Sequence, residues 1–551
     1  MKVHLYLCLL VVCGVVSGAY GAGTKLEGVF SDTTTKWTPG HGDTRAPKPV
    51  VTEFGPGYEF ECDFGLTDRA YPRCYWDTAF GPEDLTGYPS FAFRLHVKNA
   101  AAVQSVLIYM QSGAGWYLLR GLQAPVEGWN EVVIDRLGGV RVEGTPTGWE
   151  AIDHLRLNVF PATKGTATIQ IAGMRVSTTR LPLPPPPLFQ VPESDRQLPR
   201  KVQRDAAGRQ LQTRMVLDES GKFITEQDQL LDRITRAGFN AFMPCVWHGR
   251  GALYRSDLTA IEPAFAAHFE GGKDPLAELI RKAHAQGMEV HPWFCVSYRG
   301  KPDPHPEFPS EGVPNGAYDL HDPAYRALIV KEMVEFARRY DVDGINLDYI
   351  RTKGVSYSEI ARTAYQQRYG VSMDETRGAA TPEAKQRLLE FQETAVTELV
   401  RGVREGLLQV RPRAILSVCG HPLPKPQLQI EGRNEWIWLE RDLIDIAYSM
   451  DYSWRPSFFK FDEARATSVA PEQMVLMLGN YDKDETGKVV SRNAEQVARL
   501  VDYALLKYPA NGVALYWYGS LDEAQIKALR SGPFREAAVT SWTVKRARPE
   551  K

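Results

Sequence analysis

The sequence predicts an antiparallel β-sandwich of jelly-roll type followed by a (β/α)8 barrel, and two observations lead to this fold class. Through residues 24–180, apolar and polar residues alternate with period two, which is the pattern of half-buried strands. From residue 210, short apolar runs alternate with helical segments, which is typical of a parallel sheet with crossover helices. A chain of 551 residues is long enough to build both cores.

The first 21 residues predict a secretory signal peptide. Lys2 supplies a positive start, and residues 5–16 form an apolar run that is short for crossing a bilayer. Small residues follow at 17–21 and suit cleavage. An uncleaved anchor is the alternative. We therefore expect a secreted or periplasmic protein without a transmembrane segment in its mature part.

The sandwich is expected over residues 24–180. Tyr58, Phe60 and Phe64 fall on one face of a strand, with Glu59 and Glu61 on the other. Similar alternation marks runs near residues 91–98, 106–110, 132–134, 155–159 and 168–176. The architecture resembles the galactose-binding-like sandwiches that accompany many secreted carbohydrate enzymes. It is therefore expected to be an accessory domain of carbohydrate-binding type.

Five cysteines are expected to remain after removal of the signal peptide, and they fall into two groups. Cys62 and Cys74 lie close together in the sequence, and in an oxidising compartment this spacing predicts a disulfide. Cys245, Cys295 and Cys419 each sit in an apolar run and are expected to be buried thiols. The spacing of cysteines and histidines matches no zinc motif, so neither a metal nor a cofactor is expected.

Residues 181–209 are expected to be a linker, and residues 536–551 a C-terminal tail. Seven prolines stand between residues 181 and 199, and such a run favours extended polyproline II over a sheet. The barrel is then expected over residues 210–535.

Eight apolar runs within this span are the strand candidates of the barrel. An open doubly wound sheet is the alternative, but the turn after the first run, Asp218-Glu219-Ser220, lacks the glycines of a nucleotide-binding turn. The strands are expected at residues 215–218, 241–247, 289–296, 344–349, 415–419, 446–452, 475–480 and 512–517. Helices are expected at residues 226–237, 275–286, 323–340, 382–409, 436–443, 494–506 and 523–529.

Two carboxylates are expected to face the barrel axis at the carboxyl ends of strands, where such barrels carry their active sites. In strand four, Asn346 and Asp348 alternate with apolar neighbours, so Asp348 is predicted as the last inward residue and the catalytic carboxylate. In strand six, the same parity argument predicts that Asp451 points inward and donates the proton. Glycoside cleavage uses two carboxyl groups about 5–9 Å apart. Glu435, Glu440, Asp218 and Glu219 are reserve candidates.

Other polar and aromatic residues gather near the predicted strand ends, and this combination suits sugar binding. The candidates for substrate contacts are His248, His291, Trp293, Arg351, His421, Tyr452, Asn480, Trp517 and Tyr518.

The sequence resembles the glycosyl-hydrolase-like family 10, which is distinct from the xylanase family of the same number. The segments that carry the resemblance are residues 341–351 around Asp348, residues 251–256, residues 290–294 and residues 512–521. The resemblance spans about residues 210–535 and implies a (β/α)8 barrel with glycosidase activity. Related barrels place a nucleophile at strand four and an acid/base at strand six, which implies roles for Asp348 and Asp451.

These observations predict an exported glycoside hydrolase that acts on the O-glycosidic bonds of a polysaccharide or glycan. Sixty-five basic residues against 67 acidic ones argue against nucleic acid as a partner. A carbohydrate-binding barrel without catalysis is the main alternative. A polysaccharide deacetylase or esterase would need a metal held by His248, His291 and His421.

Overall fold

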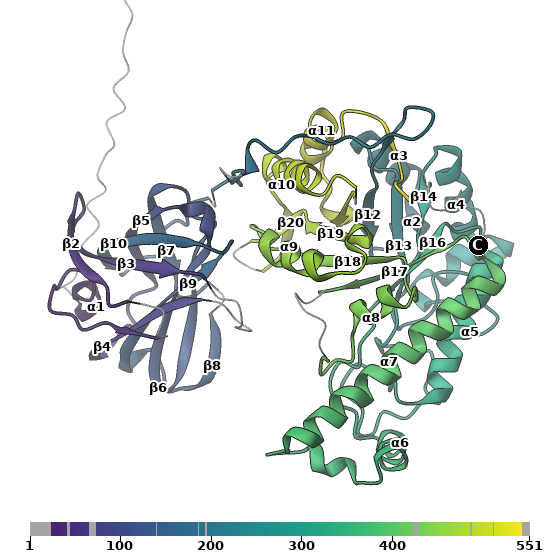
Figure 1. Cartoon of the computed structure of the whole chain (residues 1–551), viewed down its shortest axis with the longest axis horizontal. Helices are drawn as coiled ribbons and strands as arrows, with labels where there is room; N and C mark the ends of the chain where they lie inside the picture. Colours follow the sequence, from purple (N-terminus) through teal and green to yellow (C-terminus); the bar gives the residue numbers. More distant parts are fainter. Residues whose placement is uncertain are drawn as a thin grey trace, which may run out of the picture. The chain divides into compact units, whose positions relative to one another are not determined.

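The computed structural model describes residues 24–40, 45–65, 73–138, 140–185, 187–192, 195–421, 428–484, 487–510 and 512–542. The predicted signal at residues 1–21 lies outside these ranges. The chain divides into two compact units, residues 1–187 and 188–551 (Figure 1). The first is an antiparallel β-sandwich and the second a parallel barrel, so the predicted fold class is confirmed.

The sandwich packs two antiparallel sheets around an apolar core. What we call sheet I has the order β1 (Thr38–Pro39), β4 (Cys74–Glu83), β9 (Ile152–Pro161), β6 (Val103–Gln123) and β8 (Arg141–Pro146). Sheet II has the order β2 (Lys48–Thr52), β3 (Gly55–Asp63), β10 (Thr166–Ser177), β5 (Ser90–Lys98) and β7 (Gly128–Asp135). Short helical turns precede or join the strands: α1 (Lys25–Gly28), η1 (Ala100–Ala102) and η2 (Trp149–Ala151).

The predicted disulfide between Cys62 and Cys74 is wrong for this structure, which holds both as buried free thiols. Cys62 lies on β3 of sheet II and Cys74 on β4 of sheet I. Burial raises the pKa of the Cys62 thiol, and the neighbouring Cys74 raises it further. The two thiols therefore meet in the core between the sheets without a covalent bond, and the Cys74 Sγ donates to the carbonyl of Asp63 instead.

The barrel closes because β12 pairs in parallel with both β13 and β22. Strand three is divided into two short segments on either side of His291-Pro292. The strands are, in chain order, β12 (Arg214–Asp218), β13 (Ala241–Trp247), β14 (Glu289–Val290), β15 (Trp293–Cys295), β16 (Gly344–Asp348), β17 (Ile415–Gly420), β18 (Ile446–Asp451), β19 (Met474–Gly479) and β22 (Val513–Tyr516).

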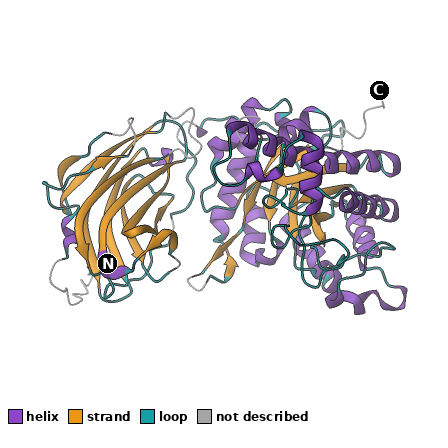
Figure 2. Cartoon of the chain, turned by 90° about the horizontal axis from the view of Figure 1, so that it is seen from below, coloured by secondary structure: helices purple, strands orange, loops and turns teal. Residues whose placement is uncertain are grey.

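Helices surround these strands (Figure 2). They are α2 (Lys222–Thr225), α3 (Gln227–Ala237), η4 (Pro263–Gly272), α4 (Pro275–Ala285), α5 (Pro323–Arg339), α6 (Glu359–Tyr369), η5 (Met373–Thr376), α7 (Pro382–Val410), α8 (Glu435–Glu440), α9 (Phe458–Thr467), η6 (Pro471–Gln473), α10 (Ala494–Lys507), η7 (Tyr518–Ser520) and α11 (Glu523–Ser531). The helix α6 and the start of α7 form an insertion with its own small apolar core, which includes Tyr365 and Phe391. The sequence analysis did not anticipate α6.

Large side chains fill the lumen of the barrel. Only residues near the carboxyl ends of the strands therefore reach the open end of the lumen. Met243, Trp293, Tyr448 and Met477 belong to one interior cluster, whereas the alternate strand residues pack against the helices. Layers of bulky side chains are usual in such barrels. Two small sheets complete the unit: β20 (Tyr481–Lys483) with β21 (Val489–Ser491), and β11 (Gln210–Leu211) with β23 (Ala538–Val539).

Segments predicted as linker and tail contribute to the barrel unit. Phe189 is buried against Phe458 and Tyr503, and its backbone N–H donates to Gln496. Trp542 joins the interior cluster and donates its indole N–H to Glu289 over 2.7 Å. Among the described residues, no helix combines the length and apolar character that crossing a membrane requires.

Candidate active site at the carboxyl ends of the barrel strands

Asp348 is the last residue of β16 and faces the lumen, as predicted. Its neighbours Ile345 and Leu347 pack against the helices. Asn346 faces the lumen one layer below and donates its side-chain amide to the Ser417 hydroxyl over 2.9 Å. In register, Asp348 lies beside Cys295 of the interior cluster. The carboxylate is therefore held at the carboxyl end of the barrel, and only 8% of the residue is exposed.

Burial raises the pKa of Asp348 to about 6. The backbone N–H of Tyr349 lies 2.6 Å from its Oδ1 and lowers the pKa, as do the positive charges of Arg351 and Arg433. The negative charge of Glu219 raises it. The carboxyl group is thus mostly ionised at neutral pH and can accept a proton only slightly below it.

Tyrosines and a tryptophan line the lumen around this carboxylate. The rings of Tyr452 and Tyr516 stack with centroids 4.8 Å apart, and Trp293 lies 6.4 Å from Tyr516. The hydroxyl of Tyr516 donates to Glu219 over 2.6 Å. Tyr349 makes an edge contact with Tyr298 at 5.4 Å. This combination of aromatic surfaces and a few fixed polar groups is typical of sugar sites.

Glu435, at the start of α8, is a second carboxylate at the end of strand five. Only 1% of it is exposed, and neither carboxylate oxygen has a hydrogen-bond partner. Its Oε1 lies 3.9 Å from the Nε of Arg433, whose Nε and Nη1 also have no hydrogen-bond partner. A Cβ on Gly420, the last residue of β17, would stand 2.2 Å from the same Oε1, so this glycine makes room for the carboxylate. Buried charged groups whose atoms have no hydrogen-bond partner call for a functional explanation.

The predicted inward orientation of Asp451 is wrong. Tyr448 and Met450 of β18 face the lumen, as does Tyr452 just after the strand, whereas Ala447 packs among the helices. Asp451 instead accepts hydrogen bonds from the hydroxyl and N–H of Ser453 and from the N–H of Ser457 over 2.7 Å. It stabilises the turn that leads into α9.

His291 lies at the opposite end of the barrel from Asp348, contrary to its predicted role in substrate binding. Its Nε2 is 2.9 Å from Glu289, its ring contacts Trp542 at 5.5 Å, and its Nδ1 faces Gly344 at the start of β16. Because it follows the first short segment of strand three, it belongs to the amino ends of the strands. It helps to close the floor of the barrel.

The two other histidines lie near the rim on different strands. Burial lowers the pKa of His248, whose ring contacts Tyr298 at 4.9 Å. Burial also lowers the pKa of His421, whose Nδ1 lies 2.9 Å from the Met450 carbonyl. The described residues contain no group of three histidine, cysteine or acidic side chains that could hold a metal ion. Because His291 lies at the amino ends of the strands and His248 and His421 follow carboxyl ends, these three histidines do not converge on one point.

Asn480 and Tyr518 support the end of strand eight from outside the lumen. Asn480 is fully buried, and its Oδ1 accepts the N–H of Trp517 over 2.6 Å. Tyr518 packs in the helical layer, where Arg233 lies over its ring. These contacts contradict substrate-binding roles for Asn480 and Tyr518. Trp517 is half-buried and stacks on Tyr516 with centroids 6.0 Å apart, so it stays a candidate.

Of the two reserve acids at strand one, only Glu219 reaches the site. Asp218 is fully buried, and burial raises its pKa to about 6. However, its side chain points away from the lumen, because the preceding residue Leu217 points into it. The Asp218 carboxylate accepts a hydrogen bond from the Ser220 hydroxyl over 2.6 Å. Glu440 is exposed at the end of α8.

Residues 219–458 match the family described as Glycosyl hydrolase-like 10. The predicted resemblance is therefore confirmed over these residues. A curated relative, the glycosyl hydrolase YngK of Bacillus subtilis (strain 168), is 25% identical over 177 residues, which is 28% of this chain and 34% of the relative. The alignment thus spans about a third of that relative's length.

Two solved structures align with part of this chain. The PgaB (BpsB) glycoside hydrolase domain from Bordetella bronchiseptica is 15% identical, with a TM-score of 0.46 over 58% of this chain and 98% of that one. The α-L-fucosidase isoenzyme 2 from Paenibacillus thiaminolyticus is also 15% identical, with a TM-score of 0.41 over 58% of this chain and 48% of that one.

The match to the Glycosyl hydrolase-like 10 family includes Asp348, Arg433 and Glu435 but ends before Tyr516. Sequence reasoning undervalued Glu435 because it stands on a short helix rather than at a strand end. The signal that could have found it is Gly420, which makes the carboxylate's close approach possible. Tyr516 could have been found from parity, since it follows the inward Ala514 by two residues.

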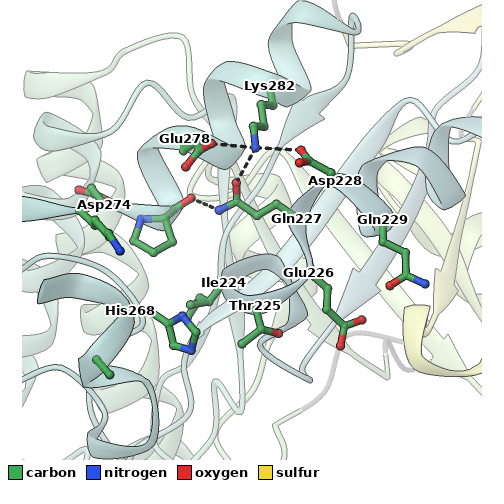
Figure 3. Close-up of a pocket in the computed structure, with 13 residues that line it drawn as sticks. Ile224, Thr225, Glu226, Gln227, Asp228, Gln229, His268, Asp274, Glu278 and Lys282 are labelled. Carbon is green, nitrogen blue, oxygen red and sulfur yellow. Dashed lines mark hydrogen bonds and ion pairs between the residues drawn. The ribbon is translucent and has the colours of Figure 1, made fainter.

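A cavity of about 500 Å³ lies elsewhere, among α2, α3, η4 and α4 (Figure 3). Three of its charged side chains are paired with one another. The Nζ of Lys282 lies 2.8 Å from Asp228 and 2.7 Å from Glu278, and Gln227 donates to the carbonyl of Pro275. The arrangement suits the packing of two helices, and none of the candidate catalytic residues lines it.

Proposed function

We propose that the barrel is an exported glycoside hydrolase that cleaves O-glycosidic bonds of a glycan, with Asp348 as nucleophile and Glu435 as acid/base. The observation that carries the proposal is the inward Asp348 carboxylate at the end of β16, with its pKa raised to about 6. The match to Glycosyl hydrolase-like 10 supports this class of reaction.

In this mechanism, the ionised carboxylate of Asp348 attacks the anomeric carbon, and Glu435 gives a proton to the leaving oxygen. Glu435 then removes a proton from the water that hydrolyses the glycosyl–enzyme ester. Its two oxygens are buried and accept no hydrogen bond from the protein, so their hydrogen-bonding capacity is not used by the fold itself. Tyr452, Tyr516 and Trp293 offer aromatic surface for the sugar ring.

Glu219 is the competing acid/base, because its charge acts on Asp348 and Tyr516 fixes one of its oxygens. The comparison of Glu435→Gln with Glu219→Gln decides between them. The variant that lost the acid/base keeps activity on aryl glycosides with good leaving groups, which need little protonation, and azide restores its turnover. The other variant loses activity on all substrates alike or barely changes.

The proposed activity is tested with a panel of nitrophenyl glycosides, soluble polysaccharides and purified peptidoglycan. We expect Asp348→Asn to lower kcat/KM by at least about 10³-fold on any substrate that the wild type cleaves. Asp451→Asn is the matched control, since it removes a carboxylate from the helix side of the strand. Equal activity of wild type and Asp348→Asn would refute the nucleophile assignment. Retention of glycans without cleavage would favour a binding barrel.

A further inference from the structure

The outer face of sheet I carries polar and aromatic side chains in register. On β4 and β9, Trp76 and Leu157 face the sandwich core, so the alternate residues Asp77 and Arg156 face outward. Asp77 pairs with Arg156, and Arg156 pairs in turn with Tyr109 of β6. Two residues further along β9, Asn158 pairs with Tyr75 of β4 on one side and with Leu107 of β6 on the other.

Arg156 organises this face. Its guanidinium lies 4.5 Å from the ring centroid of Tyr75 and 4.6 Å from that of Trp116. It also forms a two-point ion pair with Asp77, with distances of 2.6 and 2.8 Å. The side chains of Arg156 and Asp77 remain 20% and 30% exposed. The ion pair of Arg156 and Asp77 is thus held in a fixed orientation beside aromatic rings. Both side chains remain partly exposed to solvent.

Asn158 is the unexplained group on this face. It is fully buried, and neither its amide nitrogen nor its amide oxygen has a hydrogen-bond partner. Leaving a buried amide unpaired costs about 1–3 kcal/mol, so its presence calls for a partner that the protein itself does not supply.

The described outer face of sheet II differs in that no buried unpaired amide accompanies its paired polar side chains. Gln170 donates to Glu59 over 2.8 Å, and Glu131 pairs with both Arg175 and Arg94. This face also carries aromatic rings, including Trp129. Sheet II therefore provides a control surface on the same domain.

We propose that the outer face of sheet I binds a neutral polysaccharide. A sugar ring would lie on the aromatic surface of Trp116, and its hydroxyl groups would hydrogen-bond with the ion pair of Asp77 and Arg156 and with the amide of Asn158. The charged pair at the centre of the face favours a neutral ligand over an acidic one, because Asp77 already balances Arg156; around Tyr109, Glu143 lies together with Arg73 and Arg141. This site goes beyond the proposed hydrolase, and its ligand need not be the barrel's substrate.

The test uses the full chain with Asp348→Asn, which prevents degradation of the probe. Retention is measured on insoluble cellulose and chitin and by affinity electrophoresis in gels that contain xylan, galactomannan or polygalacturonate. We expect retention on at least one neutral polymer and none on the anionic polygalacturonate. Trp116→Ala should weaken that retention by about tenfold or more, whereas Trp129→Ala on sheet II should leave it unchanged.

Two further variants separate this site from the barrel and from a folding defect. Arg433→Ala disables the barrel site and should not affect retention by sheet I. Asn158→Leu removes the unpaired amide, so it should weaken retention without lowering the melting temperature. The proposal is overturned if a folded Trp116→Ala protein is retained like the parent, if Arg433→Ala abolishes retention, or if no neutral polymer is retained. All three outcomes are independent of whether the barrel cleaves glycans.

Discussion

The backbone N–H of Tyr349 donates to Oδ1 of Asp348 across 2.6 Å. Tyr349 has a φ of 48°, in the left-handed region that a tyrosine enters at a cost of about 1–2 kcal/mol. Its carbonyl accepts the hydroxyl of Ser297 and the N–H of Arg351. The end of strand four is therefore strained but held on several sides, as is common where a side chain is fixed for chemistry.

Stability should respond to Asp348 in the direction opposite to activity. The pKa of Asp348 is about 6 in the folded chain against an ordinary 3.8, so ionisation at neutral pH disfavours the folded state. The raised pKa means that this penalty is absent below about pH 4, grows as the pH rises and is complete above about pH 6. We expect Asp348→Asn to raise the free energy of unfolding by about 1–3 kcal/mol at pH 7.

Urea unfolding of wild type and Asp348→Asn at about pH 7 and pH 4 measures this difference. The gain should disappear at the lower pH. A variant that is less stable than wild type at pH 7 would contradict the burial penalty assigned to Asp348.

The pH dependence of hydrolysis should report the same carboxyl group. If Asp348 is the nucleophile, it must be ionised, so kcat/KM should fall as the pH drops below about 6. Profiles on a substrate that the wild type cleaves provide the measurement. A rate that stays level from pH 7 to about pH 4 would show that ionised Asp348 is not required.

Asp451 should matter for stability and not for chemistry. Asp451→Ala removes the acceptor for Ser453 and for the N–H of Ser457 at the start of α9. Loss of such a cap costs about 1 kcal/mol, so the melting temperature should fall by a few degrees while kcat/KM of the folded protein stays within about twofold of wild type. A loss of activity as large as that of Asp348→Asn would return Asp451 to the catalytic pair.

The sequence was sufficient for the parity of strand four but not for that of strand six, and the reason is physical. In strand four, Ile345 and Leu347 are large and apolar and pack against the helices, so the polar residues between them face the lumen. In strand six, the pattern is reversed: Tyr448 and Met450 fill the lumen, and the small Ala447 faces outward. The predicted parity of strand six was wrong because this lumen is packed with large side chains. The predicted position of His291 was wrong because strand three is interrupted at His291-Pro292. His291 therefore belongs to the amino end of the strand and not to its carboxyl end.

The C-terminal segment should be essential to the barrel, although its residues carry no motif. The residues Ala538–Val539 pair with β11, and the hydroxyl of Thr540 donates to Glu289 over 2.6 Å. Trp542 is buried against His291 beneath the lumen and donates to the same glutamate.

Replacing a buried tryptophan with alanine typically costs about 3–5 kcal/mol, so Trp542→Ala should lower the melting temperature markedly. Trp542→Phe should recover part of this loss, because it restores apolar contact but not the hydrogen bond to Glu289. Thermal unfolding measures the melting temperatures of the two variants and of a chain truncated after residue 535. We expect the truncated chain to have the lowest melting temperature, Trp542→Ala a higher one and Trp542→Phe the highest of the three. A truncated chain as stable as wild type would show that the segment only covers a floor that His291 and Glu289 already close.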